Sequence, residues 1–292
     1  MNTKTTGVIA IIGASLMWSI EPILAKLAYE EGAGYLDTSA FRAIGVALTA
    51  LAYVFLTNKG NLKVTRKQLS VLVYIALIGT MVADLLYLYA LEKIAVINAV
   101  LIGHMQPISV VLIGFLLLKE DKLTKYDYLG ICIMIVAGLL VTTKTPANLV
   151  GLRFGATEDL LVAAATVAWA TTGIAMRKYL RGLNAGVITF YRFSIASVIF
   201  VTYLSITSTI ALSSVYQILV GVTVGVGTIL YYEGLKRIKA AQVSALELST
   251  PLFAALLSFL IIREVITIMQ AFGIGLLIVG VYFLSRKEET YF

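Results

Sequence analysis

Four ionisable side chains stand inside long apolar stretches of this sequence: Glu21, Asp84, His104 and Glu247. An ionisable group is costly to place in hydrocarbon, so each of the four is a candidate functional group. Carboxylates attract ammonium groups, and a histidine titrates near neutral pH. We therefore predict that these residues bind a small charged molecule, and we take all four as candidates for exchanging a proton.

Glu21 has the most informative surroundings of the four. It lies one helical turn beyond Trp18, on the same face, and directly before Pro22. A proline inside a helix removes a backbone donor and can free carbonyl groups to line a cavity. A carboxylate beside an aromatic ring suits an organic cation. The alternative is a structural ion pair with Lys26 or Arg42.

Structural alternatives exist for the other three residues as well. Asp84 shares a helix face with Tyr87, but it could instead pair with Arg42 or Arg192. A lone buried histidine, such as His104, is often a core group with satisfied hydrogen bonds. For Glu247, the alternative is a capping or ion-pairing role.

Aromatic side chains complete the predicted binding site, because a ring can stack on a substrate while a phenol or indole forms hydrogen bonds. The aromatic residues that we assign to substrate binding are Trp18, Tyr87, Trp169, Tyr231 and Tyr232.

The elements that position these residues follow from the composition. The chain is 60% hydrophobic and 13% charged, with a mean hydropathy of +0.93. A soluble domain could not hide that much apolar surface. A transmembrane β-barrel would need polar and apolar residues to alternate with a period of two, and the apolar runs show no such alternation. We predict an all-α membrane protein with ten transmembrane helices, each long enough for a hydrocarbon core of about 30 Å. The apolar runs fall at about 7–29, 38–57, 68–91, 95–118, 126–143, 159–177, 185–206, 213–235, 240–262 and 266–285.

The order of residues in the first half of the chain returns in the second half. The offset is 151 residues at the tryptophans, 150 at the arginines and 144 at the prolines. The repeated pairs are Trp18/Trp169, Arg42/Arg192, Pro107/Pro251 and Glu120/Glu264. Each half holds five apolar runs, and five is odd, so the second copy must cross the membrane in the inverted sense. We predict two five-helix repeats, 1–145 and 146–292, in one integrated transmembrane domain.

Some positions differ between the two copies. Glu21 corresponds to Thr172, Asp84 to Thr228, and Glu247 to Gly103. We expect the substrate to be recognised at these mismatches. The matched residues, including Arg42, Arg192, Glu120 and Glu264, we assign to the scaffold.

The basic residues predict the orientation of the helices. With the N-terminus inside, 16 of the 23 lysines and arginines fall on the inner side and seven on the outer half. The positive-inside rule then places both termini in the cytoplasm. The net charge of +7 is explained by short loops that face an anionic leaflet, without nucleic acid. The seven outer residues are Lys26, Arg42, Lys93, Lys144, Arg153, Arg192 and Arg263.

Taken in order, these motifs resemble those of the drug/metabolite transporter superfamily, in its ten-helix EamA-like branch. The third helices of the two repeats end in Tyr89-Ala90-Leu91 and Glu233-Gly234-Leu235, and the fifth helices are rich in glycine. The resemblance implies alternating access through a central cavity lined by helices 1, 3, 4, 6, 8 and 9. It does not imply a substrate, because members of this branch move amino acids, nucleosides, quaternary amines and drugs.

The leading hypothesis is a secondary transporter of a small organic cation or zwitterion, of the amino acid or amine type, coupled to protons and favouring export. It depends on membrane acids beside aromatic rings and on the expectation that no basic residue lies at the middle of the membrane. One alternative is an uptake carrier of a quaternary amine or nucleoside. Alternatives of other classes are a membrane enzyme or flippase that acts on lipid-linked substrates, and a non-transporting assembly subunit.

Several absences narrow the partners and cofactors. No phosphate-binding P-loop occurs, and one cysteine with one histidine cannot build a metal cluster. We expect no enzymatic activity, no cofactor and no metal. The expected partners are a small-molecule substrate, protons and the lipid bilayer, but not nucleic acid. We expect a monomer or weak dimer in the cell (inner or plasma) membrane.

Overall fold

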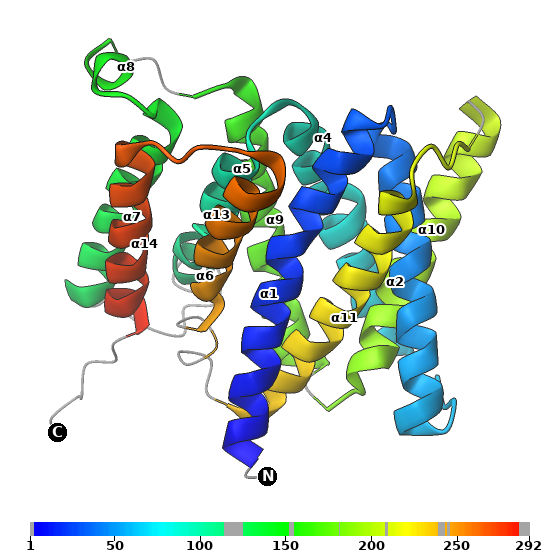
Figure 1. The fold of residues 1–292 in the computed structure, drawn as a ribbon. Helices are drawn as coiled ribbons and strands as arrows, with labels where there is room; N and C mark the ends of the chain where they lie inside the picture. The colour runs from blue at the N-terminus through cyan, green and yellow to red at the C-terminus, as the bar shows by residue number, and fades with distance from the viewer. Residues whose placement is uncertain are drawn as a thin grey trace, which may run out of the picture.

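The chain folds into a bundle of helices in a computed structural model that describes residues 3–113, 125–151, 155–180, 182–207, 210–238, 243 and 246–285 (Figure 1). Eight helical segments of the described residues are long and apolar enough to span a membrane. Two shorter apolar helices belong to the ninth and tenth predicted spans. The all-α membrane architecture is confirmed.

The first repeat starts with two unbroken helices, α1 (Thr3–Glu30) and α2 (Tyr35–Asn58). The third span is continuous but changes its winding, from α3 (Arg66–Tyr74) through the π-helical η1 (Ile75–Asp84) to α4 (Leu85–Lys93). π-Helical turns are rare and occur often at functional sites. Here the π-helix ends at Asp84. The fourth and fifth spans are α5 (Val96–Gly103) with α6 (Gln106–Ile113), and α7 (Lys125–Thr143).

The second repeat has the same order of spans, but its third span is a single α-helix. After the short α8 (Pro146–Val150) come α9 (Thr157–Tyr179), α10 (Ala185–Thr207) and α11 (Val215–Arg237). The last two are α13 (Ser249–Ile262) and α14 (Ile268–Ser285). Figure 1 shows α1 beginning and α14 ending at the same end of the bundle, opposite α8.

The fourth and ninth spans are interrupted at equivalent positions. The fourth turns at His104, and the ninth turns at Leu248, 144 residues later. Each turn lies three residues before a proline, Pro107 or Pro251. A proline has no N–H and its ring collides with the carbonyl four residues earlier, so the helix cannot continue straight through. Proline is tolerated in the first turn of the helix that follows. Discontinuous helices of this kind form the substrate sites of many transporters.

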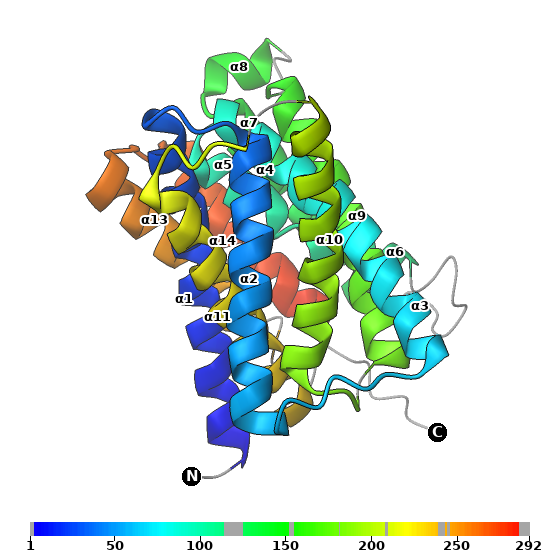
Figure 2. The same cartoon turned by 90° about the vertical axis from the view of Figure 1, so that its right-hand side faces the viewer.

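The contacts between helices are related by exchange of the two halves. The packing of α1 on α11 corresponds to α9 on η1 and α4, and that of α1 on α13 corresponds to α9 on α5 and α6. The contacts of α2 with α11 and of α10 with η1 form another such pair. Equivalent helices also meet directly: α2 with α10, α5 with α13, and α7 with α14. Figure 2 shows α2 and α10 side by side. These contacts are those of inverted repeats.

Close helix packing depends on glycine at the α2–α11 crossing. A Cβ on Gly221 would lie 2.8 Å from the Cα of Gly45, and a Cβ on Gly225 would lie 2.7 Å from Thr49. Small residues let the two backbones approach.

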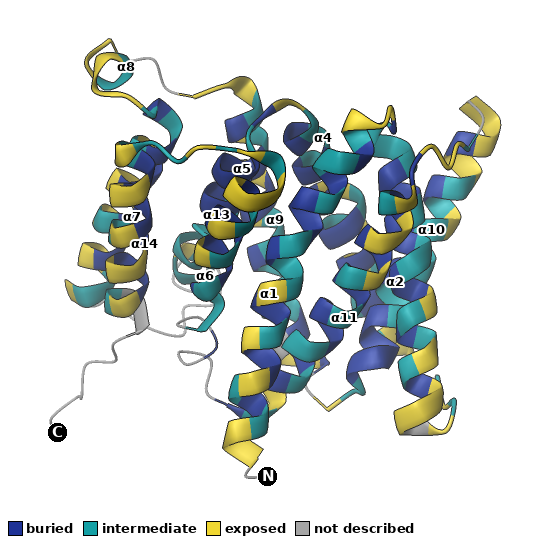
Figure 3. Cartoon of the chain, in the orientation of Figure 1, coloured by how far each residue is buried: buried dark blue, intermediate teal, exposed yellow. Residues whose placement is uncertain are grey.

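Exposed residues lie along the outside of the helices (Figure 3), and many of them are large and apolar. Leu56 is 86% exposed, Ile206 79% and Phe272 67%. Exposing so much apolar surface to water would be unfavourable, whereas contact with lipid tails is not.

Polar contacts tie the helix ends together on the side of α8. The Glu264 carboxylate accepts hydrogen bonds from the backbone N–H groups of Val96 (2.9 Å) and Ile97 (3.3 Å), at the start of α5. This contact agrees with a scaffold role for Glu264; Glu120 lies outside the described residues. Gln270 of α14 donates to Asn98 at 2.7 Å, and all these groups join elements from both repeats.

Candidate substrate site

A cavity of about 430 Å³ lies at the centre of the bundle. All nine residues that we assigned to substrate binding border it, together with the breaks in the fourth and ninth spans. The spans that the resemblance implied, 1, 3, 4, 6, 8 and 9, all contribute to its wall, and α2 and α10 add to them. The nine residues are Trp18, Glu21, Asp84, Tyr87, His104, Trp169, Tyr231, Tyr232 and Glu247.

The cavity continues toward the end of the bundle opposite α8. Along α6 it is bordered by Gln106, Val110 and Val111, and opposite them by Met176 of α9. No residue of α6 is fully buried. At the other end, on the α8 side, the Glu264 and Gln270 contacts join the two repeats.

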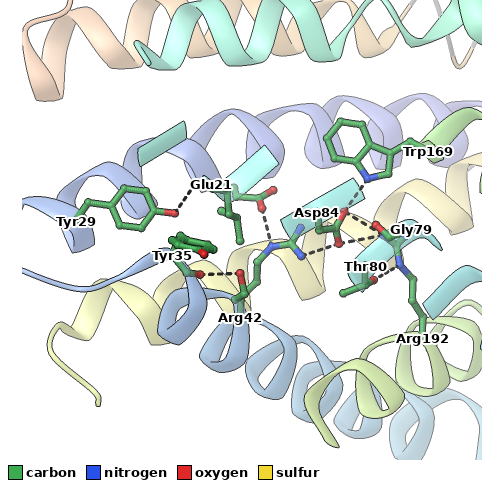
Figure 4. A network of polar contacts seen from close by, with 11 residues as sticks. Glu21, Tyr29, Tyr35, Arg42, Gly79, Thr80, Asp84, Trp169 and Arg192 are labelled. Atoms are coloured by element: carbon green, nitrogen blue, oxygen red, sulfur yellow. Dashed lines mark hydrogen bonds and ion pairs between the residues drawn. The ribbon is translucent and has the colours of Figure 1, made fainter. Parts of the chain in front are cut away.

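Asp84 is the centre of a charged network in the wall of this cavity (Figure 4). Its carboxylate accepts hydrogen bonds from Arg42 Nη1 at 2.8 Å, from Arg192 Nη2 at 3.1 Å and from Trp169 Nε1 at 2.7 Å. Asp84 is the last residue of the π-helix, and its three partners come from α2, α9 and α10. Charge-assisted hydrogen bonds of this length are the strong ones. Asp84 therefore binds together elements of both repeats.

Glu21 joins the network from α1. Its Oε1 accepts a hydrogen bond from Arg42 Nε at 2.7 Å. Its Oε2 accepts none from the described part of the chain, and this oxygen is not sealed from the cavity. The ion pair that we considered as an alternative is thus present with Arg42, whereas Lys26 donates to the backbone oxygen of Glu92. One carboxylate oxygen of Glu21 is therefore paired with Arg42, and the other is accessible from the cavity.

The expectation that no basic residue lies at mid-membrane is wrong. Arg42 and Arg192 both line the cavity, with side chains 8% and 13% exposed. The helix boundary is one reason: α2 begins at Tyr35, earlier than the run at 38 predicted, so Arg42 lies two turns inside the helix. The length of the side chain is the other.

The predicted outer position of Arg192 is also wrong. α10 begins at the same end of the bundle as α1, and Arg192 lies in its first two turns. Arg192 therefore belongs to the half that we assigned to the cytoplasm, and Arg42 to the other half. Both guanidinium groups nevertheless reach Asp84, Arg42 from α2 and Arg192 from α10. The sequence did contain a feature that pointed to the cavity, because both arginines lie inside apolar spans. We had assigned them to the scaffold because they are equivalent in the two repeats.

Aromatic pairs in the wall follow the symmetry of the repeats. Trp18 packs on Tyr231 with ring centroids 4.9 Å apart, and Trp169 packs on Tyr87 at 5.5 Å. Tyr232 lies 5.8 Å from Tyr231. Within the described residues, Trp169 donates to an acid and Trp18 does not, because the residue equivalent to Asp84 is Thr228.

His104 and Glu247 border the cavity at the breaks of the fourth and ninth spans. His104 Nδ1 lies 2.7 Å from the carbonyl oxygen of Val100, one turn earlier. Both therefore share the cavity with Glu21 and Asp84, but neither is among the described groups that donate a hydrogen bond to Asp84.

Two inverted repeats, paired helix breaks and a central charged cavity define a secondary transporter. The chain belongs to the EamA-like transporter family, whose profile matches residues 5–143 and 156–286. It is a multi-pass membrane protein and a transporter, not an enzyme.

The relatives found by sequence are transporters. An uncharacterized transporter of Methanothermobacter thermautotrophicus is 27% identical over 232 residues, 78% of this chain and 67% of that protein. The uncharacterized transporter YyaM of Bacillus subtilis is 24% identical over 282 residues, 94% of this chain and 91% of the relative. The uncharacterized inner membrane transporter YhbE of Escherichia coli is 26% identical over 271 residues, 87% and 81% of the two chains. Among solved structures, a crystal structure that covers 96% of both chains has a similar fold, with a TM-score of 0.63 at 18% identity.

Proposed function

We propose that the protein exchanges a small zwitterion or organic cation, of the amino acid or amine type, for protons and works in the direction of export. The observation that carries this proposal is Glu21, a carboxylate with one oxygen paired to Arg42 and the other open to a cavity walled by Trp18 and Tyr231. A carboxylate next to aromatic faces favours an ammonium group.

The proposed mechanism is competition for Glu21. An ammonium group beside Glu21 favours the ionised carboxylate, and a proton on Glu21 removes the attraction for the ammonium group. Substrate leaving in one direction is then replaced by a proton moving in the other. The two repeats rock around this site and expose it alternately to each side.

The other titratable residues have different parts in the proposal. Asp84 already accepts from two guanidinium groups and an indole, so we assign it to positioning the arginines. His104 and Glu247 border the cavity elsewhere and are further candidates for proton transfer. One chain contains both repeats and the whole described cavity, so a monomer is the proposed transport unit.

The test compares wild-type protein with Glu21→Gln and Glu30→Gln in proteoliposomes. Glu30 is exposed at the end of the same helix and provides the matched control. The substrates are amino acids, primary and quaternary amines, and nucleosides, each with and without a pH gradient. We expect wild type and Glu30→Gln to accumulate a substrate when the vesicle interior is acidic, and Glu21→Gln to lose this response.

Two results would contradict this role of Glu21 and this substrate class. Transport by Glu21→Gln with unchanged pH dependence would remove Glu21 from the mechanism. Quaternary amines or nucleosides as the only substrates would favour the alternative carrier.

A further inference from the structure

The two arginines of the network have donors that the protein does not use. Arg42 donates through Nε to Glu21 and through Nη1 to Asp84. Arg192 donates through Nε to Thr80 and through Nη2 to Asp84 and the carbonyl oxygen of Gly79. Arg42 Nη2 and Arg192 Nη1 donate to no group among the described residues. Neither nitrogen is closed off from solvent, and both residues border the cavity.

The orientation of both guanidinium groups is fixed. The ring of Phe193 lies 5.5 Å from the Arg42 guanidinium carbon and 4.8 Å from that of Arg192. With Asp84 and Thr80 holding the other edges, the unused nitrogens are held in place at low entropic cost. Planar guanidinium groups match the geometry of a carboxylate, which can accept two parallel hydrogen bonds.

The charges of the network leave room for such a ligand; Glu247, a further carboxylate of the described wall, lies at the break of the ninth span. Glu21 and Asp84 balance Arg42 and Arg192, so the network is formally neutral, with an open acceptor at Glu21 and open donors at the arginines. A ligand with one positive and one negative group would bind both the open acceptor and the open donors. No charge of the ligand would then be buried without a partner, which would be costly. A simple amine leaves the donors open.

We infer that Arg42 and Arg192 form a carboxylate-binding subsite, and that the substrate is an α-amino acid or a similar zwitterion and not an amine. This inference rests on the proposed function, in which Glu21 takes the ammonium group. The carboxylate binds Arg42 Nη2 and Arg192 Nη1, and the substrate side chain occupies the aromatic part of the cavity. A volume of about 430 Å³ accommodates a single amino acid.

The experiment measures binding to purified protein with matched ligands that share one side chain. Phenylalanine, its methyl ester and phenethylamine form one series, and leucine, its methyl ester and isoamylamine form another. We expect the wild type to bind an acid about 10- to 100-fold more tightly than its ester or amine, from the loss of charge-assisted hydrogen bonds. In Arg192→Gln this ratio should fall toward one.

The variants separate ligand recognition from folding. Arg192→Lys keeps the charge but not the planar fork, and we expect an intermediate ratio; it also serves if Arg192→Gln does not fold. Arg263→Gln removes an exposed arginine and should keep the full ratio. An equal loss of affinity for acid, ester and amine in both Arg192 variants would overturn the inference, because a structural role predicts that result.

Failure of the inference can be told apart from failure of the proposed function. If the amines bind as well as the acids in wild type and Glu21→Gln abolishes this binding, the carboxylate subsite is wrong and the Glu21 site stands. If Glu21→Gln leaves all binding unchanged, the proposed function fails too. Binding of none of the zwitterions overturns the inference.

Discussion

Replacement of Asp84 by asparagine tests the network most directly. Asp84→Asn keeps the shape of the side chain but removes the charge that two guanidinium groups and the Trp169 indole share. The cluster formed with Glu21 changes from formally neutral to +1. Arg42 and Arg192 are then left with Glu21 as the one carboxylate of the cluster, and Glu21 pairs with Arg42 alone.

The size of the effect follows from what each arginine keeps. Arg42 retains Glu21 at 2.7 Å, whereas Arg192 retains only the neutral acceptors Thr80 at 2.8 Å and Gly79 at 3.2 Å. Breaking a buried ion pair by removing one partner costs about 3–5 kcal/mol. Because Arg42 stays paired, we expect a loss of about 3 kcal/mol in the free energy of unfolding, at the lower end of this range.

Unfolding in mixed detergent micelles, followed by tryptophan fluorescence, measures this loss. Glu21→Gln is the matched comparison: its carboxylate accepts one hydrogen bond from the described residues, so we expect about 1–2 kcal/mol. The double variant Asp84→Asn/Arg192→Gln restores neutrality, and its destabilisation should be smaller than the sum of the single effects by about 0.5–3 kcal/mol. The reasoning is refuted if Asp84→Asn is no more destabilising than Glu21→Gln, or if the double variant is additive.

Two further predictions concern packing and closure. Gly221→Ala forces apart α2 and α11, because its Cβ would lie 2.8 Å from the Cα of Gly45. We expect it to lower the free energy of unfolding by about 1–3 kcal/mol in the same assay. Gly275→Ala is the control, since a Cβ there has open space and should cost nothing; equal losses in the two variants would contradict the packing argument. Glu264→Gln weakens the contact with the start of α5. In protein without Cys132, we expect this change to speed the labelling of Thr172→Cys, a position in the cavity wall, by an impermeant thiol reagent added from the α8 side. An unchanged rate would show that this contact does not close the cavity.

Much of the architecture could be predicted from the sequence. The apolar runs had the length of membrane spans, and the odd number per half predicted the inversion that the exchanged helix contacts show. The candidate residues were found because a charge in an apolar span is costly, and all nine border one cavity. Pro107 and Pro251 were visible as a repeated pair. Their effect on helix continuity is local chemistry, so the sequence contained it.

The assignment of the arginines could not be made in the same way. Symmetry placed Arg42 and Arg192 in the scaffold, and their ion pairs with Asp84 are compatible with that role; their place in the cavity wall was not predicted. Which acid a long side chain reaches depends on where a helix begins and on which helices cross. These are properties of packing, not of spacing along the chain.

The sequence by itself therefore determined the class of protein and the number and inversion of the spans. It also identified the ionisable side chains that are too costly to bury in an apolar span without a partner. Hydropathy, proline geometry and residue period act locally and can be followed along one chain. Only the tertiary structure decided that the acids are paired, that Asp84 rather than Glu21 is the centre of the network, and that two guanidinium groups keep unused donors beside the cavity. Pairing of this kind joins residues up to 108 positions apart, so it exists only once the two inverted repeats have closed around the site.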